Sequence, residues 1–146
     1  SIESYHVNAT IESRFARTHI VANFRNELDC SALRGFTMQL PLNAHVRSLS
    51  MTMSNGCVIS STVKSEQEAK ESFKAQVEEG TPAAILTAWD SSNYRVDVSI
   101  PKSGKTRLEV HYEERLVRKQ HELAFQLPVS PGVDVERLEV NVFVSE

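Results

Sequence analysis

The most regular pattern in the chain is an alternation of apolar and polar side chains over residues 105–119. Apolar or uncharged residues occupy every second position from Thr106 to Tyr112, and charged residues or histidine fill the positions between them. Successive side chains of a β-strand point to opposite faces of the sheet, so this segment can place one face on a core. The pattern predicts a long, half-buried strand. Tyr112 and Glu114 fall on its buried face, and we expect both to be structural residues.

Short links join this strand to alternating segments on either side, at 94–100 and at 121–127. Strands that are joined by short links usually pair antiparallel. We therefore expect these two segments to flank the long strand in one sheet. Asn55-Gly56 accepts the positive φ angles of a tight turn, which predicts a hairpin there. Alternation or apolar runs predict further strands at 4–14, 15–24, 33–40, 46–53, 57–63, 83–89 and 137–144.

The period changes near Ser65. Ser65 and Glu68 match a capping box, good helix formers follow, and Gly80 suits the C-terminal cap. These signals predict a helix over about 66–79. Its apolar stripe is narrow, so we expect the helix to dock on the sheets by one edge, with Phe73 as the anchor. The stripe contains Ala69, Phe73 and Val77.

About ten strands and one inserted helix favour an antiparallel β-sandwich. The sequence has 146 residues, and a chain of roughly that length can bury about 70% of its unfolded surface. Internal repeats and low-complexity tracts are absent from the sequence. We therefore expect residues 1–146 to form a single domain.

Composition narrows the classes of partner. The formal net charge is −3 and the pI is near 6.0, so electrostatics give no reason to expect binding to nucleic acid or to an anionic membrane. No apolar run approaches the ~20 residues of a membrane span. Ser1 is not followed by a basic and then apolar leader, so we expect any secretion signal to have been removed or to lie outside these residues. The sequence does not begin with methionine, from which we expect a mature fragment or an excised domain.

Catalytic, cofactor and metal sites are not predicted. Glu113 and Glu114 are adjacent, but on a strand they face opposite ways and cannot act on one substrate atom. We expect Glu113 to form a surface ion pair with Arg107 or Arg115, and Glu114 to accept hydrogen bonds. The histidines lack the spacing of a metal site, and solvent-facing positions are favoured for them. They are His6, His19, His45, His111 and His121.

Three residues are candidates for covalent modification. Asn8-Ala9-Thr10 is a glycosylation sequon, and Asn8 falls on the polar face of the first predicted strand. Cys30 and Cys57 both lie near loops, so a disulfide between them and a pair of free thiols are both open, with free thiols favoured.

Several basic residues could form a patch for sulfated glycans. Acidic residues such as Glu12, Glu27 and Glu113 are interspersed among them and dilute the patch, so a plain solvated surface is favoured. The basic residues are Arg14, Arg17, Arg25, Arg34, Arg115, Arg118 and Lys119.

Several stretches, in this order, resemble the VIT domain (vault protein and inter-alpha-trypsin inhibitor). The resemblance runs from Tyr5 to about Val144 and points to the secreted heavy chains of inter-alpha-trypsin inhibitor. The most specific stretches are Ser-Arg-Phe-Ala at 13–16 and the Tyr-Glu-Glu group that opens 112–118. The others are Leu40-Pro41, the Asn55-Gly56 turn, Lys64, the helix with its alanines and lysines, and residues 80–86.

The resemblance implies a non-catalytic structural and protein-interaction module of a secreted protein, packed beside a von Willebrand type A domain of the same chain. Heavy chains of that family are carried on chondroitin sulfate and transferred to hyaluronan in the extracellular matrix, through an aspartate outside these residues. The metal motif of a type A domain is absent, because Tyr94 stands where its second serine should be. Two alternatives remain: a module that binds glycosaminoglycans directly, or the VIT domain of an intracellular, vault-type cytoplasmic protein.

Overall fold

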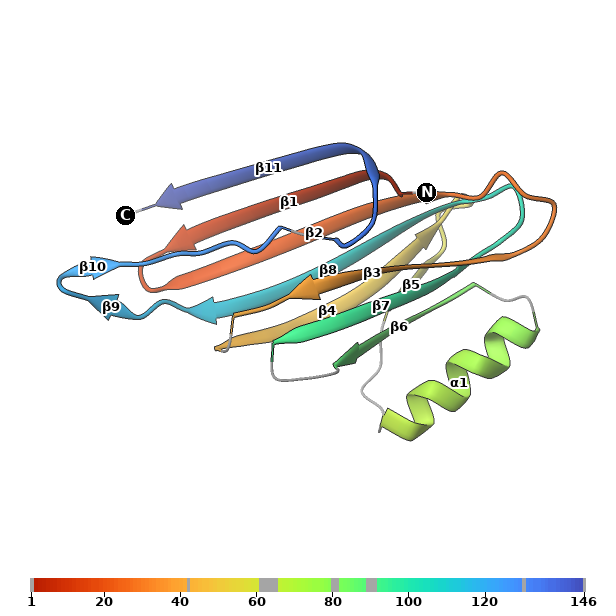
Figure 1. Cartoon of the computed structure of the whole chain (residues 1–146), viewed down its shortest axis with the longest axis horizontal. Coiled ribbons are helices and arrows are strands. Elements are labelled where there is room, and N and C mark those ends of the chain that lie inside the picture. Colours follow the sequence, from red (N-terminus) through yellow and green to blue (C-terminus); the bar gives the residue numbers. More distant parts are fainter. Residues whose placement is uncertain are drawn as a thin grey trace.

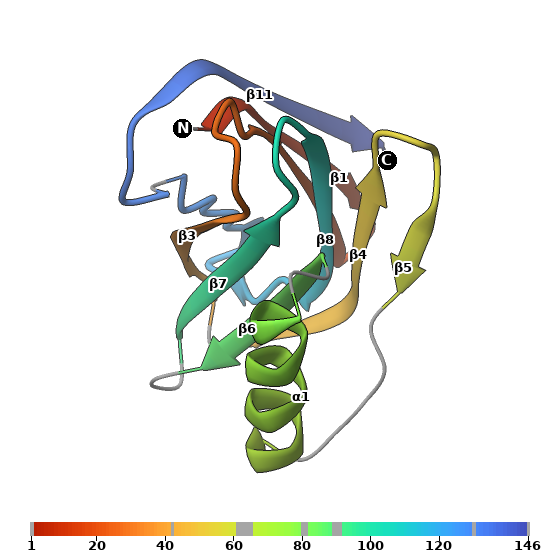
Figure 2. The same cartoon turned by 90° about the vertical axis from the view of Figure 1, so that its right-hand side faces the viewer.

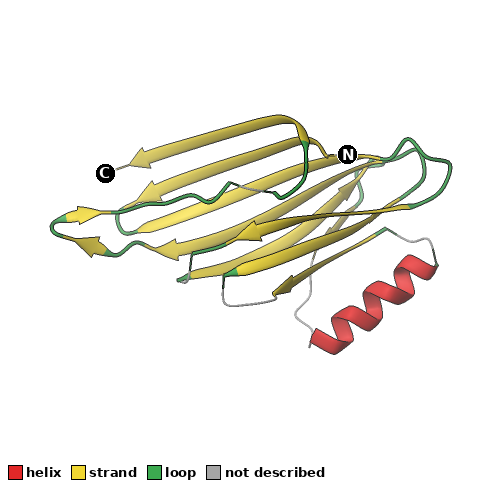
Figure 3. Cartoon of the chain, in the orientation of Figure 1, coloured by secondary structure: helices red, strands yellow, loops and turns green. Residues whose placement is uncertain are grey.

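A computed structural model of the chain describes residues 2–41, 43–60, 66–79, 82–88, 92–129 and 131–145. These residues form eleven strands and one helix, so the protein is mainly β (Figure 3). In chain order the elements are β1 (Ile2–Glu12), β2 (Phe15–Arg25), β3 (Ala32–Gln39), β4 (Ala44–Met53), β5 (Val58–Ser60), α1 (Glu66–Glu78), β6 (Ala83–Ala88), β7 (Asn93–Ile100), β8 (Lys105–Arg115), β9 (Arg118–Lys119), β10 (Glu122–Leu123) and β11 (Val135–Ser145).

Two sheets form the body of the molecule. The larger has six strands in the order β11-β1-β2-β8-β4-β5, and the smaller has three in the order β3-β7-β6. The two sheets lie in separate layers, and α1 lies outside them along β6 (Figures 1 and 2). The short strands β9 and β10 form a small hairpin at one end. This arrangement confirms the predicted β-sandwich with one helix.

The predicted neighbours of the long strand were wrong. β8 pairs with β2 on one side and β4 on the other, whereas β7 lies in the smaller sheet between β3 and β6. The turn at residues 101–104 carries the chain from one sheet to the other. Alternation shows which face of a strand is buried, but it does not identify the strand beside it. The run that was predicted to continue to 119 also ends as a strand at Arg115.

One strand pair is parallel, in contrast to the all-antiparallel expectation. β11 runs parallel to β1, with Val7 opposite Val140. Parallel neighbours need a long connection, and its described residues, 124–129 and 131–134, return along the sandwich (Figure 1). The described part of this connection packs Leu127 and Val129 against the core. It also holds the edge of β3, because the Thr37 N–H donates to the carbonyl of Pro131 at 2.8 Å.

The core lies between the sheets and is built from alternate residues of their facing strands. Phe36 of β3 is its aromatic centre: Tyr5 meets it edge-on at a centroid distance of 5.6 Å, and Phe24 stacks against it at 6.1 Å. Burying one such aromatic side chain contributes about 1.5–3 kcal/mol. The inner residues of β8 complete the layer, so the pattern that marks β8 in the sequence also marks the centre of the core.

The helix and the hairpin turn follow the sequence signals. α1 spans Glu66–Glu78, close to the predicted 66–79, while the proposed caps Ser65 and Gly80 lie outside the described residues. Gly56 has a φ of 84° and donates its N–H to the carbonyl of Met53 at 2.9 Å. This closes the β4–β5 turn that the Asn-Gly pair predicts.

Candidate interaction surfaces

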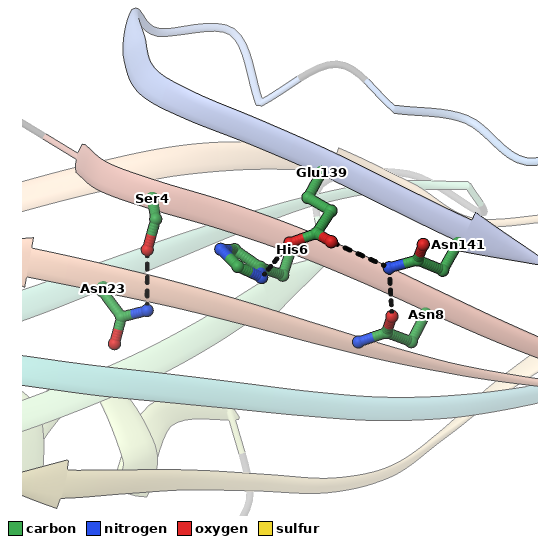
Figure 4. Close-up of polar contacts among 6 residues, drawn as sticks. All are labelled: Ser4, His6, Asn8, Asn23, Glu139 and Asn141. Atoms are coloured by element: carbon green, nitrogen blue, oxygen red, sulfur yellow. Dashed lines mark hydrogen bonds and ion pairs between the residues drawn. The ribbon is translucent and has the colours of Figure 1, made fainter.

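A ladder of polar side chains crosses the outer face of the larger sheet between β11, β1 and β2 (Figure 4). His6 Nδ1 lies 3.1 Å from Glu139 Oε2, and Asn141 donates from Nδ2 to Asn8 Oδ1 at 3.0 Å. These contacts join β1 to its parallel neighbour side chain to side chain. Around these four residues the outer face is therefore hydrophilic and already paired, while Phe143, farther along the same face of β11, is 60% exposed.

Two histidines stack farther along the same face. The His19 and His111 rings lie 4.0 Å apart at an interplanar angle of 9°. Burial and the neighbouring His111 lower the pKa of His19. Its Nε2 lies 3.2 Å from Glu109 Oε1, close enough for an ion pair but without hydrogen-bond alignment. No three potential ligands gather into a metal site within the part of the chain that the structure describes.

Glu113 and Glu114 face opposite ways, as the alternation predicts. Glu113 lies outward, and its partners are Arg47 at 3.1 Å and Arg17 at 3.9 Å, in place of the expected Arg107 or Arg115. Glu114 lies inward and is only 7% exposed. Its Oε1 has no hydrogen-bond partner among the described atoms, and burial raises the pKa of its carboxyl group.

Tyr112 is fully buried in the core, where burial raises the pKa of its hydroxyl group. Phe73 is half-buried and lines a groove of about 450 Å³ between α1, β4 and β6. The structural roles assigned to Tyr112, Phe73 and Glu114 stay predictions, which substitutions can test.

The candidate modification residues lie at the surface. Asn8 sits half-buried on the outer sheet face, with its Oδ1 facing Asn141. Cys30, in the link between β2 and β3, and Cys57, in the β4–β5 turn, are both exposed free thiols.

The last strand carries an exposed apolar stripe. Four residues of β11 share the face on which its neighbour β1 buries Tyr5, Val7 and Ala9. On β11, however, this face is open, because the smaller sheet does not extend over it. The exposed fractions are 51% for Leu138, 42% for Val140, 47% for Val142 and 69% for Val144. The sequence shows that these residues share a face, but it does not show that the face lacks a cover.

Asn26 is a structural residue that the sequence does not reveal, because it sits in a stretch that reads as a polar link. It is only 3% exposed. Its Nδ2 donates to the carbonyls of Cys30 at 2.8 Å and Pro101 at 3.0 Å, and its Oδ1 accepts the N–H of Leu28 at 3.0 Å. Asn26 therefore joins the β2–β3 link to the β7–β8 turn.

Comparison with curated proteins finds heavy chains of inter-alpha-trypsin inhibitor. Heavy chain H2 of Mesocricetus auratus is 30% identical over 100% of this chain and 16% of the relative. Heavy chain H4 of Bos taurus is 29% identical over 99% of this chain and 16% of its own length, and heavy chain H6 of Homo sapiens is 29% identical over 98% and 11%. The chain thus spans about a sixth of the length of the first two relatives.

Among solved structures, a putative nutrient binding protein of Legionella pneumophila covers 80% of this chain and 39% of its own, with a TM-score of 0.43 and 10% identity. That likeness is too weak to bear on function. In the part of the chain that the structure describes, no helix is both long and apolar enough to span a membrane. The family model of the vault protein inter-alpha-trypsin domain matches residues 2–112, and the chain therefore belongs to the VIT domain family.

Proposed function

We propose that this chain is a non-catalytic structural and protein-interaction module of a secreted, multidomain, heavy-chain-like protein. In this role it packs against a neighbouring domain of the same polypeptide, a von Willebrand type A domain, and fixes its orientation. Any association with hyaluronan or with chondroitin sulfate proteins would belong to the full-length protein. The relatives named above support this proposal, because each is far longer than the matched region.

The apolar stripe of β11 is the observation on which the proposal rests. Its four residues alternate on one face of an edge strand, and each is at least 42% exposed. Folded monomers rarely leave large contiguous apolar patches in water, and those that exist often mark interaction sites. The free edge of β11 adds unpaired backbone groups on the side away from β1, and such edges are usually covered or protected.

The polar groups on the outer face of β11 support the assignment of the interface to the inner face, because they differ from the apolar stripe in already having partners. There Glu139 and Asn141 are already paired with His6 and Asn8 of β1. A neighbouring domain would gain little from covering groups that have partners, whereas covering the inner stripe removes apolar surface from water.

Hydrogen exchange in the full-length protein tests the proposal. We expect the β11 amides to exchange much more slowly in the full-length protein than in residues 1–146 alone, because the neighbouring domain covers the strand. The double variant V140E/V144E should lower the Tm of the full-length protein by several degrees and restore fast exchange in β11. In residues 1–146 alone the same variant should change the Tm little.

The matched control uses the opposite edge of the sheet. Val58 and Ile59 of β5 are 59% and 43% exposed, so V58E/I59E places the same charges on a comparable apolar edge. This control should leave the full-length protein unchanged. Equal β11 exchange in the long and short proteins, or a larger effect of V58E/I59E, would contradict the assignment of the interface to β11.

A further inference from the structure

A hollow lined with cations opens at the end of the sandwich where β8 ends. Its volume is about 650 Å³. Segments far apart in the sequence meet there: the β1–β2 turn, the start of β4, and the end of β8 with the residues that lead into β9. The lining residues are Arg14, Asn43, His45, Arg115, Leu116, Val117 and Arg118.

The backbone fixes this convergence. The Leu116 N–H donates to the carbonyl of Arg14 at 2.6 Å, which holds the turn against the end of β8. Arg115 pairs in register with Phe15, the residue after Arg14. Leu116 is 5% exposed and anchors the floor of the hollow in the core. The basic side chains therefore extend from a rigid support into solvent.

Within the part of the chain that the structure describes, no carboxylate neutralises the charge of the hollow. No lining residue is acidic, and no carboxylate of the described residues lies within ion-pair distance of Arg14, Arg115 or Arg118. Glu113 lies opposite His45 in register, but its carboxylate contacts Arg47 and Arg17. Glu114, the next residue, lies in the core.

Other basic residues contrast with this cluster. Arg25 and Arg34 line a smaller hollow of about 230 Å³ together with three carboxylates, and Arg25 contacts two of them, Glu3 at 2.6 Å and Glu27 at 3.7 Å. Within the described residues, Arg25 is therefore ion-paired in an acidic surrounding, whereas Arg14, Arg115 and Arg118 lie together without an acidic partner. The sequence predicts a diluted basic surface, because it does not show which of the interspersed acidic residues lie near which basic ones.

We propose that this hollow, lined by Arg14, His45, Arg115 and Arg118, binds a sulfated oligosaccharide through its sulfate and carboxylate groups. Guanidinium groups form strong, bidentate contacts with oxyanions. The hollow is open and its basic residues come from three segments, so it suits several anionic groups on one ligand better than a single ion. This site is separate from the β11 stripe and goes beyond the proposed scaffold role.

The structure favours a saccharide over nucleic acid. No phenylalanine, tyrosine or tryptophan lines the hollow, so the His45 ring is its single aromatic group, whereas single-stranded nucleic acid sites stack successive bases on several aromatic side chains. The net charge of −3 also gives no extended basic surface to follow a long phosphate backbone.

The test is an NMR titration of the ¹⁵N-labelled chain with a heparin-derived tetrasaccharide at 0.15 M NaCl. We expect saturable shifts in the amides of Arg14 and residues 115–118, and weaker binding of inorganic sulfate. The double variant R14Q/R118Q should weaken tetrasaccharide binding about fivefold or more, because two contacts with charged groups are lost. Both side chains are exposed, so the variant should keep the wild-type Tm. R115Q provides a second, independent variant with the same expected direction.

The matched control is R34Q/K102Q, which removes the same charge from exposed positions outside the hollow and should change the affinity less than twofold. A desulfated tetrasaccharide should not bind. Equal weakening by the two double variants would overturn the proposal, because it would show unspecific attraction. Absence of saturable shifts with the tetrasaccharide, or equally tight binding of a DNA oligonucleotide of matched charge at the same amides, would also overturn it.

Discussion

Ala16 of β2 lies directly opposite Glu114 of β8 in the larger sheet, and both side chains point into the core. On the other side of Glu114 the paired residue is also an alanine, Ala44 of β4. Two small neighbours leave room for a carboxyl group on the inner face, but they offer it no hydrogen-bond donor. The Ser-Arg-Phe-Ala and Tyr-Glu-Glu stretches that characterise the sequence therefore form one structural unit, with Glu114 at its buried side.

This environment predicts that Glu114 lowers the free energy of unfolding at neutral pH, where its carboxyl group tends to ionise. Because burial raises its pKa in the folded state, the unfolded chain loses this proton first as the pH rises. The stabilising effect of the bound proton is therefore complete below about pH 4.5, the ordinary value for glutamate, and is lost as the pH rises through the folded-state pKa. E114Q should be more stable than wild type at pH 7, because it removes the charge that the buried site disfavours. Urea denaturation at pH 4 and pH 7 measures the difference.

The control for this prediction is E113Q on the outer face. Its contacts with Arg17 and Arg47 are partly exposed, so its loss should change the free energy of unfolding by no more than about 0.5 kcal/mol. Its pH profile should follow that of wild type. Negligible shifts for both variants would show that Glu114 has no special role.

Asn26 predicts a second large effect on stability. The variant N26A removes the donor that its side chain supplies to the carbonyls of Cys30, Ile100 and Pro101. Leaving buried polar groups without partners costs about 1–3 kcal/mol, and we expect a loss in the upper half of that range. Thermal and chemical denaturation would measure it. N23A, which removes one bond to Ser4 Oγ, should cost about 1 kcal/mol, and a similar loss for both variants would argue against a special role of Asn26.

The sequence predicts the strands well because each half-buried strand carries a period of two. The alternation of β8 identifies its inner residues, Tyr112 and Glu114 included, and the Asn-Gly pair identifies the β4–β5 turn. It does not identify the partners of β8, because register and neighbours depend on contacts between distant segments. The parallel pairing of β11 with β1 could not be predicted from the sequence for the same reason.

The features of the candidate sites also differ in whether they follow from one segment alone or depend on contacts between distant segments. Opposite orientations of Glu113 and Glu114 follow from the strand alone, whereas the ion pairs of Glu113 depend on β4, which lies far away in the sequence. The basic hollow could not be predicted, since its residues come from separate turns. Asn26 was missed because a polar residue in a link usually faces water.

The position of Asn8 predicts that it carries an N-glycan when the protein is produced through a secretory pathway. Its Oδ1 accepts from Asn141, which leaves Nδ2, the atom that carries an N-glycan, on the outer face (Figure 4). We expect the intact mass of protein secreted from mammalian cells to fall by one glycan after enzymatic deglycosylation. Both N8Q and T10A should abolish that difference, because each destroys the sequon. An unmodified mass in secreted wild-type protein would refute the prediction.

Substituting alanine at Gly56 and at Gly132, which have similar backbone angles, distinguishes the cost of backbone strain from the cost of a steric clash. Gly56 has a φ of 84° and Gly132 a φ of 72°, so an alanine at either position adopts a conformation that side chains disfavour by about 1 kcal/mol. A Cβ at Gly56 would meet nothing within 4 Å, but one at Gly132 would lie 2.6 Å from Thr37 Oγ1. That oxygen also lies 3.3 Å from the carbonyl of Pro131, so its displacement disturbs the contact between β3 and the segment that leads into β11.

G132A should therefore lower the free energy of unfolding by clearly more than G56A, by about 2–3 kcal/mol against about 1 kcal/mol. Chemical denaturation of the two variants gives both values. The double variant G132A/T37S retains the hydroxyl group and should stay as unstable as G132A, whereas G132A/T37A removes the blocking oxygen and should recover part of the loss. If T37A gives no recovery, then Thr37 does not set the cost at Gly132, and the docking of residues 131–134 on β3 is looser than the contacts indicate.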